Sequence, residues 1–530
     1  MRDLTEQLMV FPARGIMVLS PRFAQQPGTC VDCLNVRAFD VEEDRARGGS
    51  RPGLSKYCSQ QLDSARIQNI NYSVTMTNTS PNTAWLFSRE VHAAAVCNGF
   101  VYEFNTTTAT KASQAGSWSL SNTAPVIYSA ELFGDLYYCD GLSYRKWDSS
   151  TNAESDWTAS TDGTLPGDPP NTAARLITMW RSRIVLSGLV TDPHNWFMSR
   201  LGDPLDWEYA PNTTTETQPV QGGLGFAGKI GDKVTALIPY SDDILLIGCD
   251  HTIWQMSGDP QAGGRVDLVS SEIGIAWGEA WTISPEGSLY FMSNKASVWQ
   301  LQPGDGPKEL SAMTVSPLIE NTNLNTSSVK LSWDTEHDGI HMWITPLTAG
   351  SATHWFFDGR TQGWFKDIYA STNHNPVTAK VFDGDSNNDR VVMIGSEDGY
   401  IRKIDDSAYQ DDGTGFESSV TMGPLFSKEG HKPVVLKELQ AVTDVNSDTI
   451  KFEVVGGDTP DEAINSFDGT FTGSGGSWSA GLGTTHNPRQ RGYYVYVKVG
   501  QNASAKSWAL EYIRTTHSTV SSSKGRQATN

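Results

Sequence analysis

Short apolar stretches separated by turn residues recur along most of the chain. From about residue 85 to residue 405, the repeating unit is a short apolar strand, a turn, a stronger apolar strand, a second turn and a strand that ends in an aromatic residue. The turns contain Gly, Asn and Asp, as in Asn98-Gly99 and Asp140-Gly141. These residues adopt the positive φ angles of tight hairpins at low cost. The pattern therefore predicts three or four antiparallel strands in each unit.

The repeat predicts a β-propeller. Units begin at residues 91, 126, 176, 234, 275, 329 and 378. Their spacing of about 48 residues matches the ~40–50 residues of a propeller blade. A lone four-stranded sheet leaves two apolar faces uncovered, so such sheets pack radially around an axis. We expect a six- or seven-bladed β-propeller-like domain over residues 85–405. Four tryptophans near the unit ends are expected to pack between blades: Trp147, Trp254, Trp299 and Trp364.

The pattern changes after the repeat. Residues 406–415 are acidic and contain glycine, which is typical of a linker. Alternation of period two returns over residues 416–517 and predicts half-buried antiparallel strands in a C-terminal β-sandwich-like domain. Residues 1–84 are expected to form an N-terminal extension and strand region, and residues 518–530 a flexible polar tail. The fold class predicted for the whole chain is all-β.

Composition narrows the class of protein further. Among 530 residues, 49 Gly and 25 Pro are spread along the chain, which disfavours a helical architecture. No apolar run approaches the ~18 residues that cross a bilayer, and the first residues do not resemble a secretory signal, so we expect no stable membrane association. The net charge of −20 at pH 7 disfavours tight nucleic-acid binding, because affinity for phosphate requires a high density of Lys and Arg.

Candidate reaction chemistry is sparse. Cys30 and Cys33 form one C-x-x-C pair, whereas a zinc site needs a second pair, so the six cysteines are expected to be reduced, partly buried thiols. The acyl-transfer, metalloprotease and phosphate-binding motifs are absent from the sequence. Residues 383–389 resemble a Ca²⁺ loop without its terminal Glu, which favours a solvated hairpin tip. We expect no catalytic residue, cofactor or metal, and a protein that is not an enzyme.

Three stretches share features with one protein family. Near the start, N-V-R at 35–37 leads through Gly48 and Gly49 to R-P-G-L at 51–54. The C-terminal part has R-x-Y-x-V at 491–495, followed by Trp508 and Leu510. A central signature is carried by Arg183, Ile184, Ser187, Trp196, Ser199, Asp203, Pro204 and Trp207. Together these stretches resemble the propeller-bearing tail proteins of short-tailed bacteriophages, which are called phage stabilisation proteins, tail hubs or nozzles.

The resemblance implies a structural virion protein. Such proteins form a ring, usually sixfold, that extends the portal–adaptor channel, retains packaged DNA and provides the conduit for DNA ejection. The implied partners are further copies in a homohexamer, tail adaptor or portal-proximal ring proteins, and tail fibre or needle proteins. Double-stranded DNA would pass without specific binding, which suits an acidic chain. The implied location is the tail of the virion, after assembly in the cytoplasm of the host bacterium.

Two other interpretations remain open from the residues alone. One is a generic propeller adaptor. The other is a carbohydrate-active propeller, either a glycoside hydrolase or a lectin, which would explain the acidic turns and the tryptophans. A hydrolase predicts paired carboxylates, at least one with a raised pKa, beside a tryptophan in the propeller mouth.

A basic patch within the acidic chain is a candidate contact site. It consists of Arg45, Arg47 and Arg51. We expect these arginines to contact an acidic neighbouring subunit. The alternative is that they lie in a solvated loop.

Overall fold

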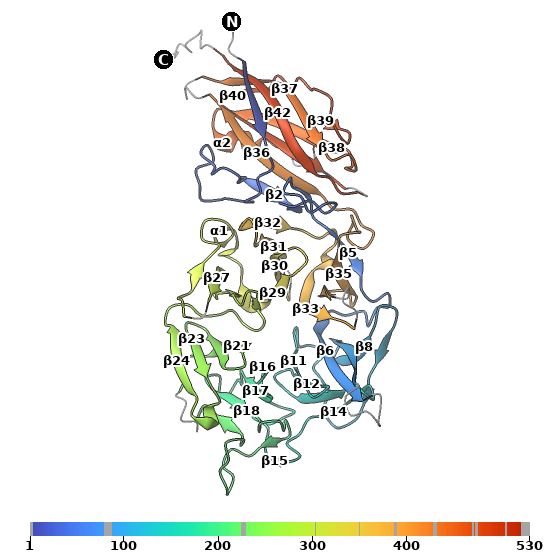
Figure 1. Ribbon diagram of the computed structural model, residues 1–530, viewed down its shortest axis with the longest axis vertical. Helices are drawn as coiled ribbons and strands as arrows, with labels where there is room; N and C mark the ends of the chain where they lie inside the picture. Colours follow the sequence, from blue (N-terminus) through green and yellow to red (C-terminus); the bar gives the residue numbers. More distant parts are fainter. Residues whose placement is uncertain are drawn as a thin grey trace.

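The computed structural model describes residues 4–78, 87–223, 229–302, 304–348, 350–385, 390–427, 432–468, 471, 475–503 and 506–520. The molecule is elongated, with a β-propeller below a β-sandwich, and both chain ends lie at the far end of the sandwich (Figure 1). Within these ranges, no helix is long and apolar enough to cross a membrane. The helical elements are α1 (Ser316–Ile319), α2 (Pro460–Asn465) and the 3-10 turns η1 (Pro260–Ala262), η2 (Leu324–Thr326) and η3 (Thr372–His374).

Seven sheets in the described part of the chain form the blades. From the axis outwards, blade one contains β6 (Ile67–Asn78), β7 (Phe87–Cys97), β8 (Phe100–Phe104) and β9 (Ala109–Lys111). Blade two contains β11 (Tyr128–Leu132), β12 (Asp135–Cys139), β13 (Tyr144–Asp148) and β14 (Ala153–Asp156), with β10 (Ser113–Gln114) added outside β14. Blade three contains β16 (Leu176–Trp180), β17 (Arg183–Ser187), β18 (Trp196–Met198) and β20 (Val220–Gln221), and β15 (Asp162–Gly163) pairs with β19 (Asp206–Trp207) beside it.

The remaining blades follow the same plan. Blade four contains β21 (Val234–Ser241), β22 (Ile244–Cys249), β23 (Ile253–Ser257) and β24 (Arg265–Ser270). Blade five contains β25 (Trp281–Ile283), β26 (Leu289–Met292), β27 (Val298–Leu301) and β28 (Lys308–Glu309). Blade six contains β29 (Ser327–Asp334), β30 (Gly339–Pro346), β31 (Thr353–Asp358) and β32 (Gly363–Asp367). Blade seven contains β33 (Pro376–Asp383), β34 (Arg390–Ser396), β35 (Ile401–Asp405) and β5 (Gly53–Lys56).

Strand β5 closes the ring from the N-terminal side of the chain. It pairs antiparallel with β35, with Leu54 opposite Ile404, and the Leu54 side chain is buried. At Gly53 the backbones are so close that an added Cβ would lie 2.3 Å from the carbonyl oxygen of Gln410. Blade seven therefore consists of strands from both ends of the propeller sequence, which ties the first blade to the last.

The propeller starts earlier in the chain than the repeat predicted. Residues 1–84 are not a separate extension, because β5 and β6 belong to blades seven and one. Strand β6 lacks a clear apolar pattern, since Asn69, Asn71 and Ser73 are polar and yet buried. Asn69 donates a hydrogen bond to the carbonyl oxygen of Ile127 in the next blade, at 2.9 Å. The buried polar residues of β6 interrupt the apolar alternation, so the sequence pattern did not predict this strand as part of a blade.

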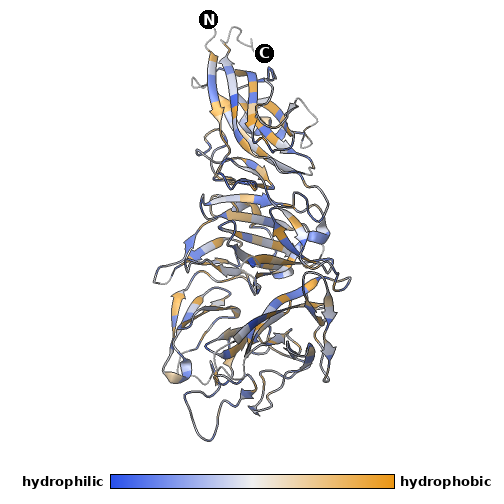
Figure 2. Ribbon diagram, turned by 45° about the vertical axis from the view of Figure 1, so that its right-hand side comes forward, coloured by the Kyte–Doolittle hydropathy of each residue, from blue (hydrophilic) through white to orange (hydrophobic). Residues whose placement is uncertain are grey.

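Apolar side chains fill the spaces between neighbouring blades. Trp147 is fully buried in a cluster shared by blades one and two. Trp254 packs on the cluster between blades three and four, and Trp299 on the one between blades four and five. Trp364 lies in the core shared by blades five and six and the sandwich. The expected packing role of these four residues is confirmed, and Figure 2 shows the apolar and polar positions that alternate along the strands.

The C-terminal domain is a two-sheet sandwich. One sheet has the order β1 (Leu4–Met9), β42 (Leu510–Thr519), β37 (Val434–Thr443) and β40 (Arg491–Gly492). The other has the order β2 (Asp32–Leu34), β36 (Ser418–Phe426), β41 (Tyr494–Gln501), β38 (Ile450–Gly457) and β39 (Gly475–Trp478). N-terminal strands thus complete both sheets. Strand β41 is buried on both faces, rather than half-buried as predicted, because Ala463 of α2 packs with Tyr496.

The two domains meet at the outer edge of blade six. Strands β2 and β3 (Val36–Arg37) lie against β32, and β3 pairs with β4 (Gly49–Ser50). Residues 406–415 are not a loose linker, because Asp411 is buried and forms β-bridges with Leu54 and Thr414. Of the expected tail, Ser518 and Thr519 belong to β42, and residues 521–530 lie outside the described residues.

Candidate functional site

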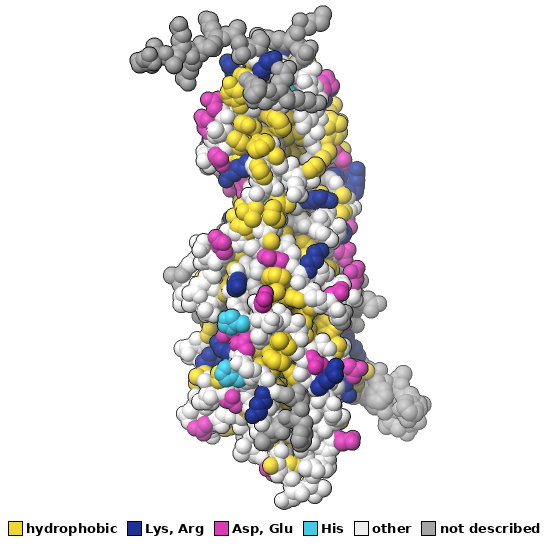
Figure 3. Space-filling model, turned by 90° about the vertical axis from the view of Figure 1, so that its left-hand side faces the viewer, with side chains coloured by type: hydrophobic (Ala, Val, Ile, Leu, Met, Phe, Trp, Pro, Cys, Tyr) yellow, Lys and Arg dark blue, Asp and Glu magenta, His cyan; other side chains and the backbone are white. Residues whose placement is uncertain are grey.

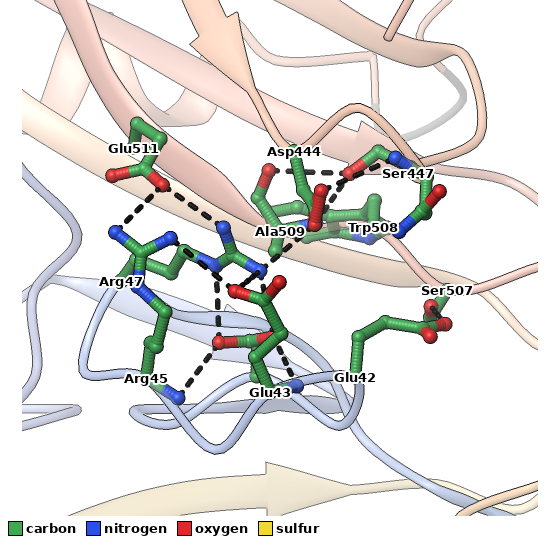
Figure 4. Close-up of polar contacts among 12 residues, drawn as sticks. Glu42, Glu43, Arg45, Arg47, Asp444, Ser447, Ser507, Trp508, Ala509 and Glu511 are labelled. Carbon is green, nitrogen blue, oxygen red and sulfur yellow. Dashed lines mark hydrogen bonds and ion pairs between the residues drawn. The ribbon is translucent and has the colours of Figure 1, made fainter. Parts of the chain in front are cut away.

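The predicted basic patch lies in the N-terminal segment that joins the two domains, residues 35–54, here called the junction segment. Arg47 is buried between this segment and the sandwich (Figure 4). Its guanidinium donates to Asp40 at 3.0 Å within the segment. Across the contact it donates to Asp444 at 2.8 Å and to Glu511 of β42 at 2.9 Å. Arg47 therefore links the junction segment to the sandwich.

Two further arginines of the junction segment are buried in paired hydrogen bonds. Arg51 donates to both carboxylate oxygens of Asp411, at 2.9 and 2.7 Å, and its guanidinium lies 3.9 Å from the ring centre of Phe416. Arg37 donates to both oxygens of Asp367 in β32, at 2.8 and 2.7 Å. This two-pronged geometry gives strong, directional pairs. Sequence reasoning missed Arg37, although it belongs to the N-V-R stretch.

The expected role of the patch is wrong for two of its three residues. Arg47 and Arg51 are saturated by carboxylates of their own chain and are buried, so they neither face a neighbouring subunit nor lie in a solvated loop. Arg45 is half-exposed and pairs with Glu43 and Glu511 at 3.3 and 3.2 Å. The carboxylates that these arginines contact outside the junction segment are Asp411, Asp444 and Glu511. All three belong to the C-terminal half of the same chain.

The electrostatics of the junction follow from this pairing. Burial on its own would lower the pKa of Arg47, but hydrogen bonds to Asp40 and Glu511 outweigh it and raise the pKa. Burial would likewise raise the pKa of Asp367, and the charge of Arg37 holds it below its usual range. Arg47 and Asp367 therefore stay ionised near neutral pH, and the ion pairs that they form hold the junction together.

A histidine network lies at the turn between β29 and β30. His337 contacts Asp334 through Nδ1 at 2.8 Å and Asp406 through Nε2 at 2.9 Å. His341 contacts the same Asp334 at 3.1 Å. Burial would lower the pKa of His337, but the two carboxylates raise it to about 10. The imidazole is therefore charged at neutral pH and unsuited to act as a general base, even though a groove of about 620 Å³ adjoins it.

A second cavity, of about 280 Å³, lies on the propeller axis. It is partly open and is formed by the inner strands of several blades. Its lining includes Asn71, Tyr72, Tyr128, Glu131, Glu279, Trp281 and Lys380. Lys330 of β29 forms an ion pair with Glu279 at its wall. These residues come from segments that are far apart in the sequence, and none of them was predicted as a site residue.

The two glutamates of this axial cavity have opposite pKa shifts. Burial raises the pKa of Glu131. Burial would also raise the pKa of Glu279, but the charges of Lys330 and Lys380 outweigh it and lower the pKa. One carboxyl is thus biased towards the protonated form and the other towards the ionised form. Trp281 lines the same cavity as these two carboxyl groups.

Other candidate groups have structural roles. All six cysteines are buried and free, as expected. The pKa of Cys30 is raised by its hydrogen bond with Cys33 and by burial, which suppresses the reactive thiolate. In the predicted Ca²⁺-like loop, Asp383 and Asp385 pair with Arg89, and residues 386–389 lie outside the described residues. Within the described ranges, no three His, Cys, Asp or Glu side chains are placed to hold a metal ion.

Comparisons with known proteins show likeness to solved β-propellers. No family model and no curated protein matches the chain. YCF48 from Cyanidioschyzon merolae is 11% identical with a TM-score of 0.39, over 66% of this chain and 98% of that one. The extracellular domain of BT4673 from B. thetaiotaomicron, a putative hybrid two component system, is 11% identical with a TM-score of 0.42. That match covers 78% of this chain and 53% of the BT4673 domain, so the chain spans about half of it. At this identity the likeness concerns the fold alone.

Replacing Arg47 tests the importance of the junction. Arg47→Met leaves the buried Asp40 and Asp444 carboxylates without their partner, and we expect a loss of about 3–5 kcal/mol in the free energy of unfolding. Urea unfolding followed by tryptophan fluorescence measures it. The control is Arg45→Met, which removes a half-exposed pair and should cost less than about 1 kcal/mol. Equal losses in the two variants would contradict the assigned role of Arg47.

The pH dependence of stability tests the histidine network. The pKa of His337 is about 10 in the folded protein and about 6.5 in an unfolded chain. Its stabilising contribution is therefore complete below pH ~6.5 and is lost as the pH rises through about 10. We expect the difference in unfolding free energy between wild type and His337→Gln to shrink over that window. His251→Gln, at a side chain that is 79% exposed, is the control. A difference that stays constant up to pH ~10 would exclude this assignment.

Proposed function

We propose that this protein is a structural component of the tail of a short-tailed bacteriophage, where copies form a ring around the DNA path. The observation that carries the proposal is the junction. There Arg37 of the N-V-R stretch, Arg51 of the R-P-G-L stretch and Arg47 between them are buried and hold propeller and sandwich together. Buried, hydrogen-bonded ion pairs disfavour relative motion of the domains. A ring that withstands internal DNA pressure needs such a rigid building block.

The central signature also consists of residues that hold the structure together. Arg183 is buried in blade three and donates to the carbonyl oxygens of Ser199 and Gln218 at 2.7 and 2.8 Å. The indole of Trp207 donates to the carbonyl oxygen of Pro204 at 2.9 Å. In this chain these residues of the central signature therefore have a structural role. They support a shared architecture as the basis of the resemblance.

The charge distribution agrees with passage of DNA without binding. Acidic and basic side chains are interspersed on the face shown in Figure 3. Several arginines already form ion pairs within the chain. Because the net charge is −20, few Lys and Arg side chains remain to bind DNA phosphates. The propeller axis is occupied by side chains such as Glu279 and Lys330. The DNA path would therefore run through the centre of the ring of copies and not through a propeller.

Strand β1 is a surface suited to contact between copies. Among the described residues it pairs only with β42, so no described strand pairs with its other edge. Leu4, Leu8 and Val10 are 59%, 62% and 65% exposed. An uncovered edge with exposed apolar residues is prone to pair with another chain. We assign the subunit contact to this strand in place of the arginine patch.

Imaging of particles tests the proposal. In virions of the phage that encodes this chain, cryo-electron microscopy should show it as a ring below the adaptor, and particles without it should lose their DNA. Leu4→Lys with Leu8→Lys should prevent ring formation while the subunit stays folded. Leu268→Lys, at a residue 49% exposed on β24, is the control. Absence of the chain from purified particles would refute the proposal.

A carbohydrate-active propeller is the second candidate, and the axial cavity favours it. Glu131 would act as the acid and Glu279 as the ionised carboxylate, in line with their pKa shifts. For a hydrolase we expect turnover of a panel of aryl glycosides and a loss of about 10²–10⁴-fold in kcat for Glu279→Gln. The exposed Glu286→Gln is the control. No hydrolysis of any glycoside by the wild-type chain would remove this candidate.

A further inference from the structure

The axial cavity contains an unbalanced cation. Lys330 and Lys380 both act on Glu279, but only Lys330 forms an ion pair with it. No carboxylate of the described residues lies within 4.0 Å of the Lys380 ammonium group. Glu279 retains 33% of its side-chain exposure, so the pair borders the cavity and is not sealed behind its wall. Lys380 is therefore an ammonium group of the cavity lining without an ion-pair partner among the described residues, whereas Lys330 is paired with Glu279.

The other carboxyl group of the lining has a different partner. Glu131 accepts a hydrogen bond from the backbone N–H of Gly134 at 2.8 Å and forms no ion pair with Lys380. Burial lowers the pKa of Lys380, and the nearby charge of Glu279 offsets this only in part. An anion in the cavity would reverse this, because an opposite charge within ~4–6 Å stabilises the ammonium form. Lys380 is thus the group in the cavity that a negatively charged ligand would pair with.

The size and the walls of the cavity limit the ligand further. A volume of about 280 Å³ is just below the ~300–1,000 Å³ of common small-molecule sites, which fits a single six-membered ring with substituents. Trp281 and Tyr72 supply aromatic surface. Glu131 and Glu279 supply oxygen atoms that can accept hydrogen bonds from hydroxyl groups. An apolar ring face, several hydroxyls and one carboxylate are the features of a sugar acid.

We propose that the axial cavity is a binding site for a monosaccharide-sized sugar acid of the hexuronate class, with its carboxylate on Lys380 and its ring against Trp281. This inference rests on the carbohydrate-active candidate proposed above and deepens it by naming a ligand class, but it requires no bond cleavage. If the chain binds a sugar acid but hydrolyses no glycoside, the binding site is supported and the hydrolase candidate is refuted. The site is distinct from the junction and from the histidine network.

Calorimetric titration of the full chain with glucuronate tests the proposal. We expect saturable binding of one molecule per chain. Lys380→Met should weaken it by about 10–100-fold, which is the effect of losing a hydrogen bond to a charged group. Lys295→Met, at an exposed lysine outside the cavity lining, should leave the affinity unchanged. No binding at concentrations up to about 10 mM, or equal binding by Lys380→Met, would overturn the proposal.

A second arm uses only the wild-type chain, so it holds even if Lys380→Met fails to fold. Glucuronamide and glucose have the same ring but lack the negative charge. Both should bind at least about tenfold more weakly than glucuronate, and added NaCl should reduce the difference. Equal affinity for glucuronate and its neutral amide would show that Lys380 does not select an anion and would overturn the proposal.

Discussion

The structure depends on the pairing of buried arginines in the junction segment. Arg37, Arg47 and Arg51 each reach carboxylates that lie hundreds of residues away, on blade six, on the sandwich and on the segment between the domains. A buried charge without a partner is very costly, whereas a fully hydrogen-bonded pair is tolerated. These pairs therefore penalise any arrangement in which the domains separate, and they convert two bodies into one elongated unit.

Ring closure and the polar axis follow from the same N-terminal part of the chain. After the junction segment, β5 enters blade seven and β6 begins blade one, so a single stretch joins both ends of the ring to the sandwich. The inner strands approach one another closely, and buried side chains such as Asn69 bond directly to the next blade. A polar axis costs little when its groups are satisfied in this way. It also leaves room for the charged cavity around Glu279 and Lys380.

The two proposed roles use different parts of the molecule. A tail ring would use the rigid junction and the edge of β1 with which no described strand pairs, whereas ligand binding would use the axial cavity. The axial cavity is too small and too full of side chains for DNA, so the two roles do not compete. The sequence indicated the first role through family resemblance and left carbohydrate binding open as an alternative, but it did not identify the residues of the axial cavity. Glu131, Glu279 and Lys380 lie in unrelated local patterns, and only the closed ring brings them together.

Local patterns in the sequence determined the number of blades to within one, five of the seven blade starts to within two residues, and the inter-blade tryptophans. They could do so because alternation and turn chemistry act between residues close in the chain. The tertiary structure alone decided that β5 closes the ring, that β6 is an inner strand, and that Arg47 and Arg51 are buried within their own chain. The physical reason is that burial and ion pairing are set by which distant segments meet, and a one-dimensional pattern of polar residues does not distinguish a solvated charge from a paired one.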